Sequence, residues 1–309
     1  MTNFIQDILP PELGEQILSN CDPVEVAAFA QTSRFFRSLI YETADQHFWR
    51  VLYLNQPFDD PRSCVSSLGK PQPTTIDWKS ELQRIIRART IVENITLCRP
   101  DERCTVLRTF LDMIYNIPPA AHILSDKSSQ NLRWVADVLG GCTLLDEQAP
   151  SAEEHQLRAR LHTHYGITPL DIQNSKRVES RAFIYDLRKY TPANHFGPFM
   201  DGTGTVNWVH MQAIHHVISM HLVHLGKDED LAFTNFPLSL PFCQPIIPEG
   251  MDLDEVEDWA GVGGMWTCAY CFCDHRELLV YNSVGRHKLS TLAFPWRFVA
   301  TVRTRPVNI

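Results

Sequence analysis

The densest group of side chains that could do chemistry lies near the C-terminus, where four potential zinc ligands follow one another. They are Cys268, Cys271, Cys273 and His275, and all belong to residue types that coordinate zinc. The stretch also alternates like a β-strand, in which successive side chains point to opposite faces. Cys271 and Cys273 would then face away from Cys268, and no glycine lies between Cys268 and Cys271 to form a knuckle turn. We therefore expect buried strand thiols, no metal and no cofactor.

A histidine-rich segment, residues 206–225, is a second candidate. Its periodicity predicts a helix, and it carries His210, His215, His216, His221 and His224. His210, His221 and His224 fall near one edge of the apolar stripe, where imidazoles could bind a metal or respond to pH near 6.5. However, His221 and His224 lie more than two helical turns from His210, too far to share an ion. We expect histidines that pack and hydrogen-bond.

A glycine-rich turn, Gly202-Thr203-Gly204-Thr205, precedes this helix and is similar to an anion-binding loop, because glycines let backbone amides approach a phosphate. The flanking pattern is missing, since no strand precedes the turn and no Lys-Ser/Thr follows it. A simple loop is the better interpretation. The chain also lacks a Gly-x-Ser-x-Gly elbow and a His-Glu-x-x-His pair. We expect this protein not to be an enzyme, with a zinc-dependent enzyme built on the Cys/His clusters as the least favoured alternative.

Composition narrows the class of protein. The chain has 309 residues, 44% of them hydrophobic, which allows a sizeable core and excludes bulk disorder. Its net charge of −8 argues against binding to nucleic acid. No apolar run reaches the ~18 residues of a membrane helix, and no signal peptide is expected. Nine cysteines, an odd number, do not form a disulfide framework, so we expect a protein of the cytosol, the nucleus or both, with no membrane partner.

The elements that must position these residues are mainly helical. Start signals and apolar periodicity predict three short helices within residues 1–55, and Pro-rich residues 56–76 predict a linker. A long helix is expected over 78–94, and further helices near 103–116, 129–145, 152–164, 175–189 and 206–225. Three short helices bury too little apolar surface to be very stable alone, so this module should complete its core against something else.

The C-terminal segment, residues 236–309, is expected to contain β-strands. Alternation over 266–273, a turn, and a returning apolar stretch over 278–281 predict a hairpin, with 298–302 as a third strand. The predicted fold class is thus mainly α with a small C-terminal antiparallel β-sheet (α+β). The predicted organisation is a three-helix module over 1–55, a linker over 56–76, a helical body over 77–235, and a Pro/acidic loop with a small sheet over 236–309.

The N-terminal module resembles an F-box, the helical module that docks substrate receptors onto the Skp-type adaptor of SCF ubiquitin ligases. The resemblance is carried over about 45 residues by Leu9-Pro10-Pro11-Glu12-Leu13, Ile17-Leu18, Asp22-Pro23, Phe29 to Arg34, Leu39 and Phe48-Trp49. It implies that an adaptor is bound by Leu9, Pro10, Leu13, Ile17, Leu18 and Val24, with Phe35, Phe36 and Leu39 in support. Asn20-Cys21 departs from the pattern, because an apolar residue often ends the first helix there.

The rest of the chain resembles, more loosely, the variable part of a large group of fungal F-box proteins. The residues that carry this second resemblance are Asp77-Trp78-Lys79, Tyr185 to Arg188, Gly197-Pro198-Phe199, Val206-Asn207-Trp208, Asp258 to Val262, Gly264, Trp266 and Asn282. The resemblance brings no established substrate. On physical grounds we expect most of these residues to serve in packing.

Together these features predict a substrate-recruiting adaptor subunit of an SCF-type ligase, bound to a Skp-type adaptor and through it to a cullin. An F-box scaffold that works without a cullin is the alternative. The speculative substrate site is a Gly/Pro-rich aromatic loop and an acidic loop, represented by His195, Phe196, Phe199, Asp254 and Trp259. Loops on a packed scaffold often carry recognition. The competing interpretation is that Phe196 and Trp259 plug the core.

Overall fold

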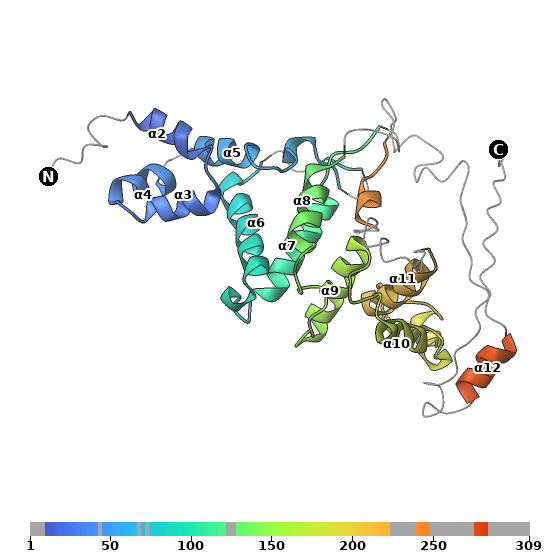
Figure 1. Ribbon diagram of the computed structural model, residues 1–309. Helices are drawn as coiled ribbons and strands as arrows, with labels where there is room; N and C mark the ends of the chain where they lie inside the picture. The colour runs from blue at the N-terminus through green and yellow to red at the C-terminus, as the bar shows by residue number, and fades with distance from the viewer. Residues whose placement is uncertain are drawn as a thin grey trace, which may run out of the picture. The chain divides into compact units, whose positions relative to one another are not determined.

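The computed structural model describes residues 10–42, 45–66, 69–71, 75–121, 128–222, 239–247 and 275–283. The chain divides into two compact units. The first unit comprises Met1–Leu144 with Pro241–Ile247, and the second comprises Leu145–Leu240 with Pro248–Ile309. Throughout the described residues the regular elements are helices (Figure 1). None of those helices is long and apolar enough to span a membrane.

Four short helices open the first unit: α2 (Pro11–Leu18), α3 (Pro23–Ala30), α4 (Arg34–Tyr41) and α5 (His47–Leu54). Pro11 and Pro23 occupy first helical positions, where the missing N–H costs nothing. Asp22 caps α3 by accepting a hydrogen bond from the Val24 amide at 2.8 Å, and Glu25 accepts from the Asp22 amide at 3.3 Å, which completes a capping box. The three predicted helices are present, and α5 adds a fourth.

Three longer helices follow in the same unit: α6 (Trp78–Glu93), α7 (Arg103–Tyr115) and α8 (Gln130–Leu139), with the short 3-10 turns η1 (Pro61–Ser63) and η2 (Ile95–Leu97). The helices predicted over 78–94 and 103–116 agree with α6 and α7 to within one residue, whereas α8 ends six residues before the predicted 145. The apolar stripe of α6 is buried as its spacing predicts, with Leu82, Ile85 and Ile91 each 1% exposed or less.

A chain of aromatic rings joins the short helices to the long ones. Tyr53 of α5 packs against Phe58 and Trp78, with ring centroids 5.3 and 5.4 Å apart. Phe58 then packs edge-on against Trp134 of α8 at 5.3 Å, and Trp134 stacks on Phe110 of α7 at 5.9 Å. Such pairs add to the stabilisation that burial alone provides. The short helices therefore complete their core on the helices that follow, as expected for so small a module.

Polar contacts hold the same junction. The Gln46 side chain accepts a hydrogen bond from the Trp78 amide at 2.6 Å and donates to Asp77 at 3.1 Å, at the start of α6. Arg89 of α6 forms an ion pair with Asp22 of α3 at 2.8 Å. Residues 77–79 thus attach α6 to the N-terminal helices, although the prediction places a linker between the two.

The second unit contains α9 (Ala152–Tyr165), α10 (Asn174–Ile184), α11 (Trp208–Leu222) and α12 (His275–Ser283), with the turns η3 (Leu187–Lys189) and η4 (Pro192–Asn194). A further turn, η6, spans Leu240–Cys243. The helix α11 packs against both α9 and α10. Gln156 of α9 orients the start of α11, because its side chain accepts from the Trp208 amide at 2.7 Å and donates to Asn207 at 3.0 Å.

The predicted C-terminal antiparallel sheet is wrong. Residues 278–281, predicted as the returning strand, lie within helix α12, and the described residues contain only isolated β-bridges. Short apolar runs do not distinguish strand from helix by periodicity, and Glu277, Leu278 and Leu279 are good helix formers. Asn282 also anchors this helix, since it accepts from the Leu187 amide at 2.9 Å and donates to the Tyr185 carbonyl at 3.0 Å. Residues 266–273 and 298–302 lie outside the described residues.

Buried histidines form much of the polar core of the second unit. His162 lies 3.1 Å from the Asp171 carboxylate, and His216 bonds the Asp171 carbonyl at 2.9 Å. Burial, followed by the charges of Arg160 and His215, lowers the pKa of His164 to about 4. Burial and then the charge of His162 lower the pKa of His215 to about 4. Burial alone would also lower the pKa of His162, but the hydrogen bond to Asp171 and the nearby carboxylates outweigh burial and raise it.

The lowered pKa values of His164 and His215 should reduce the stability of the second unit as the pH falls below about 6.5, the ordinary pKa of histidine in an unfolded chain. The raised pKa of His162 acts in the opposite direction. His164 and His215 have lower folded pKa values, so below that pH the unfolded state binds protons first. Their contribution is complete above about pH 6.5 and is lost as the pH approaches 4. Urea unfolding at about pH 7.5 and at about pH 5 measures this loss, with the NMR signal of the Trp208 indole N–H as the probe of the second unit.

The double variant His164→Gln, His215→Gln should lose less stability between these two pH values than the wild type. His155→Gln, at an exposed position on α9, is the matched control and should keep the wild-type loss. A double variant with the full wild-type loss would contradict the assignment.

Candidate protein-binding sites

Exposed aliphatic side chains lie on each of the first two helices of the first unit. Leu13, Ile17 and Val24 are 47%, 57% and 45% exposed, and they are the large hydrophobic residues exposed in the described part of residues 10–55. Leu13 and Ile17 are four residues apart on α2, so they lie on one face of the helix. We call these three residues the α2–α3 apolar face. Exposed aliphatic residues on two consecutive helices are candidates for contact with a protein partner.

The other residues predicted to contact the adaptor have different positions. Leu18 and Phe36 are buried, Phe35 and Leu39 are half-buried, and Pro10 is exposed. Leu9 lies outside the described residues. The predicted set therefore divides into an exposed group that can touch a partner and a buried group that holds the helices in place.

Side-chain hydrogen bonds close the end of α2, where the sequence departs from the F-box pattern. Asn20 donates to the Gln16 carbonyl at 2.7 Å, and Cys21 donates to the Ile17 carbonyl at 3.5 Å. Asn55, at the end of α5, donates to the Ser19 carbonyl at 2.9 Å. The polar residues thus satisfy backbone carbonyls that the helix end leaves free, and the departure is compatible with an intact α2.

The site predicted around His195, Phe196 and Phe199 lies in a loop over residues 191–206 that presents an aromatic ring to solvent. Phe196 is 65% exposed, and both His195 and Phe196 have left-handed backbone conformations, with φ of 54° and 55°. This conformation costs a bulky residue roughly 1–2 kcal/mol. We call residues 191–206 the Phe196 loop. The interpretation of Phe196 as a core plug is wrong, because its side chain is largely in solvent.

Hydrogen bonds hold the Phe196 loop in shape. Asn194 is buried, accepts from the Thr191 amide at 3.0 Å and donates to the Lys189 carbonyl at 2.6 Å. At the other end the Met200 amide donates to Thr205 at 2.8 Å, and Gly202 and Gly204 have φ of 69° and 66°. The Gly-Thr-Gly-Thr segment is therefore a turn, as predicted. Phe199 is half-buried, while Asp254 and Trp259 lie outside the described residues.

The candidate metal ligands are not assembled in the part of the chain that the structure describes. Within it, no group of three or more His, Cys, Asp or Glu side chains could hold an ion. His210 bonds Tyr190 at 3.2 Å, His215 bonds Ser239 at 2.6 Å, and His216 bonds Ser180 at 2.6 Å. The packing interpretation is confirmed for these three. Cys268, Cys271, Cys273 and His224 lie outside the described residues.

Comparison with known families gives one match. Residues 6–55 match the family model described as F-box-like, and the structure describes this region from Pro10 onward. F-box domains are typical of non-enzymatic adaptor proteins in ubiquitin ligase complexes and generally bind a Skp-type protein. No curated protein and no solved structure matches the chain. The resemblance of residues 77–283 to fungal F-box proteins stays a prediction.

Replacing Phe196 should not destabilise the second unit. Phe196→Gly removes an exposed ring and relieves the left-handed conformation, so the free energy of unfolding should stay equal or rise by up to about 1 kcal/mol. Phe110→Ala is the contrast, because this ring is fully buried and its loss should cost about 3–5 kcal/mol. Urea unfolding measures both, and a Phe196→Gly loss above about 2 kcal/mol would show that the ring supports the fold.

Proposed function

We propose, on the premise that residues 6–55 form an F-box-like domain, that this protein recruits substrates to an SCF-type ubiquitin ligase. In this function the F-box binds a Skp-type adaptor and, through it, a cullin, while the rest of the chain holds a protein substrate. The observation that carries the proposal is the α2–α3 apolar face, whose three aliphatic side chains lie in solvent within the F-box-like region.

The energetics of this face favour a partner. Each fully buried Leu, Ile or Val side chain contributes about 1.5–3 kcal/mol relative to an exposed one. Leu13, Ile17 and Val24 together could therefore supply several kcal/mol on binding. Leu18 and Phe36 are buried and belong to the core that supports these helices. The face is available without refolding, since Asp22 caps α3 and Asn55 holds the end of α2.

The chain itself needs to perform no chemistry in this function. An adaptor that holds a substrate beside a ubiquitin-charged enzyme raises the effective concentration of the two reactants, and that alone accelerates transfer. The proposal places the protein in the cytosol, the nucleus or both, where such ligases act.

For substrate recruitment we propose the Phe196 loop. An exposed aromatic ring on a loop held by a buried asparagine is a rigid anchor, and aromatic side chains are frequent among the residues that dominate protein interfaces. The strain of its left-handed backbone is also typical of functional positions. His195 and Phe199 flank the ring, and the acidic loop with Asp254 and Trp259 remains part of the proposed site.

The double variant Leu13→Ala, Ile17→Ala should abolish capture of a purified Skp-type adaptor by the full-length protein. Truncating an interface anchor costs about 2 kcal/mol or more, roughly thirtyfold in affinity. Both positions are exposed, so the free energy of unfolding should change by less than about 1 kcal/mol.

The matched control for this experiment is Leu97→Ala, Ile246→Ala, which also removes two aliphatic side chains of the first unit, each 48% exposed. This control should retain adaptor binding. Undiminished binding by the Leu13/Ile17 variant would reject the proposed interface. Adaptor binding without recovery of a cullin from cells would instead indicate a scaffold that works without the ligase.

Phe196→Asp should remove the protein substrate and leave the adaptor bound. The readout is quantitative capture from cells in which cullin activity is blocked, so that substrates are retained. Phe242→Asp is the control, because Phe242 is 78% exposed and lies in the first unit. Proteins lost with Phe196→Asp but retained with Phe242→Asp are the expected substrates, and identical captured sets would exclude the loop as the substrate site.

A further inference from the structure

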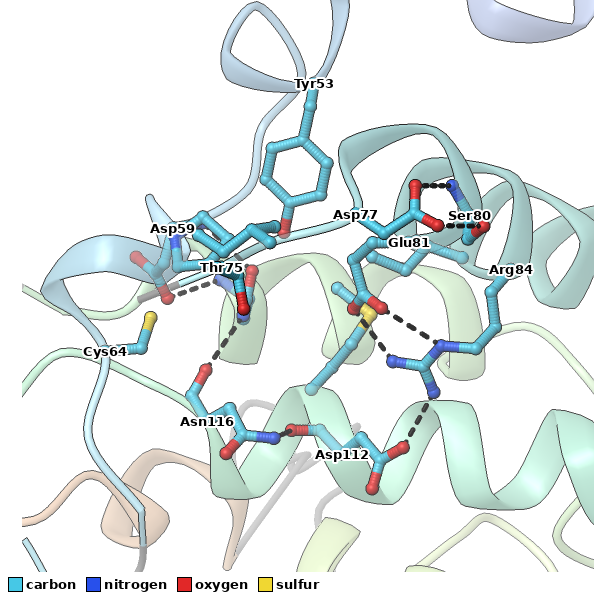
Figure 2. A pocket seen from close by; sticks show the side chains of 15 residues that line it. Tyr53, Asp59, Cys64, Thr75, Asp77, Ser80, Glu81, Arg84, Asp112 and Asn116 are labelled. Carbon is cyan, nitrogen blue, oxygen red and sulfur yellow. Dashed lines mark hydrogen bonds and ion pairs between the residues drawn. The ribbon is translucent and has the colours of Figure 1, made fainter. Parts of the chain in front are cut away.

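The first unit contains a cavity of about 340 Å³ between helices α5, α6 and α7 (Figure 2). Its position does not overlap the α2–α3 apolar face. Tyr53 enters it from α5, Glu81 and Arg84 from α6, and Asp112 from α7. This volume is at the lower end of the range for small-molecule sites, about 300–1,000 Å³. It can therefore hold a small ligand or one long side chain.

An unused hydrogen-bonding group points into this cavity. Tyr53 is only 2% exposed, and its ring is held between Phe58 and Trp78, so the hydroxyl has a defined direction. Figure 2 shows the hydroxyl inside the cavity, and it makes no hydrogen bond to the protein in the described residues. Burial, and then the charges of Glu81, Cys64 and Asp59, raise the pKa of Tyr53, so the phenol stays protonated. The hydroxyl is open to the cavity, so a ligand that enters can hydrogen-bond it.

The charge of the cavity lining favours a positively charged ligand. Its described lining contains the carboxylates of Asp59, Asp77, Glu81 and Asp112, with Arg84 as its basic residue, so the formal charge is −3. Arg84 is already engaged, since it bonds Glu81 at 2.8 Å and Asp112 at 2.7 Å. An anion would therefore meet repulsion and no free cation. A cation meets an excess of negative charge, which Asp77 and Asp112 carry at the exposed rim and Asp59 carries further inside.

The walls of the cavity favour an organic cation over a metal ion. The described residues contain no group of side chains placed to hold a metal. Asp59 is occupied as the cap of α8, because it accepts from the Gln130 and Asn131 amides at 2.9 and 3.1 Å. The apolar side chains of Ile85 and Met113, each 3% exposed or less, line the same space and suit an alkyl stem.

We propose that this cavity binds a guanidinium or primary ammonium group carried on a short alkyl stem. The Tyr53 oxygen accepts a hydrogen bond from the cationic N–H groups, and the stem packs on Ile85 and Met113. Glu81 and Asp112, each paired with Arg84, use their remaining lone pairs to balance the charge. The group can belong to a free small molecule or to an arginine or lysine side chain of a bound protein. The site does not depend on the proposed function, since none of its residues belongs to the α2–α3 apolar face or the Phe196 loop.

Calorimetry with the full-length protein tests the proposal. N-acetyl-arginine amide represents a protein side chain, and agmatine represents a free small molecule. The matched control is N-acetyl-citrulline amide, which keeps the shape of the arginine derivative and removes its charge. Binding of either guanidinium probe, at least tenfold tighter than the citrulline derivative, is the expected result. The tighter of the two identifies the source of the group.

Two conservative variants locate the binding. Glu81→Gln should lower the affinity for the guanidinium probe at least tenfold, since it removes a negative charge that faces the ligand. Tyr53→Phe keeps the packed ring and should weaken binding about fivefold, the effect of one hydrogen bond. Asp101→Asn removes one negative charge at an exposed position of the same unit and should change nothing.

All three variants should still capture the Skp-type adaptor, so failure of this site can be distinguished from failure of the F-box proposal. The cavity proposal is overturned if neither guanidinium probe binds. It is also overturned if the citrulline derivative binds equally well, or if Glu81→Gln and Tyr53→Phe both bind like the wild type.

Discussion

The first unit depends on the packing of Tyr53, Phe58, Trp78 and Trp134 against one another. These rings come from α5, the segment after it, α6 and α8. Tyr53 lies 5.3 Å from Phe58 and 5.4 Å from Trp78, and Phe58 lies 5.3 Å from Trp134, between ring centroids. Four short helices cannot bury enough apolar surface alone, and this cluster lets them share the core of the longer helices. The F-box-like region is thus a part of the first unit and not an appendage to it.

This shared core has two consequences for function. The helices α5 and α6 that carry it also hold α2 and α3, through Asn55 to Ser19 and Arg89 to Asp22, while Leu13, Ile17 and Val24 stay in solvent. The shared core also orients Tyr53, whose ring is a core residue and whose hydroxyl faces the cavity. One side chain therefore serves both the packing of the unit and the recognition that we propose for the cavity.

The second unit is built differently, because polar side chains occupy much of its interior. His162, Asp171 and His216 form a connected buried network, and Glu154 pairs with Arg158 on α9. Such networks stabilise a fold only when their groups are satisfied, which makes the unit sensitive to protonation. The Phe196 loop is held by the same kind of contact, since the buried Asn194 bonds the Thr191 amide and the Lys189 carbonyl where the loop begins.

Sequence reasoning could identify the helices and the F-box because their signals are local. The Asp22 cap and the apolar spacing of α6 each lie within a few residues, and the proposed adaptor face comes from two consecutive short helices. The same reasoning failed at residues 278–281, because a short apolar run fits a strand and a helix equally well. The helix that forms there makes long-range hydrogen bonds. Its Asn282 bonds Leu187 and Tyr185, which lie 95 and 97 positions earlier in the sequence.

Tertiary structure alone decided which residues face solvent and which meet in a cavity. From the sequence Phe196 could have been a core plug or a surface anchor, and its exposure follows from a left-handed backbone turn that no local pattern predicts. Tyr53, Glu81 and Asp112 are separated by about thirty residues each and carry no shared motif. They meet because ring packing brings α5 onto α6 and an arginine bridges α6 to α7. A contact between distant helices depends on the whole packed core, and no local pattern encodes it.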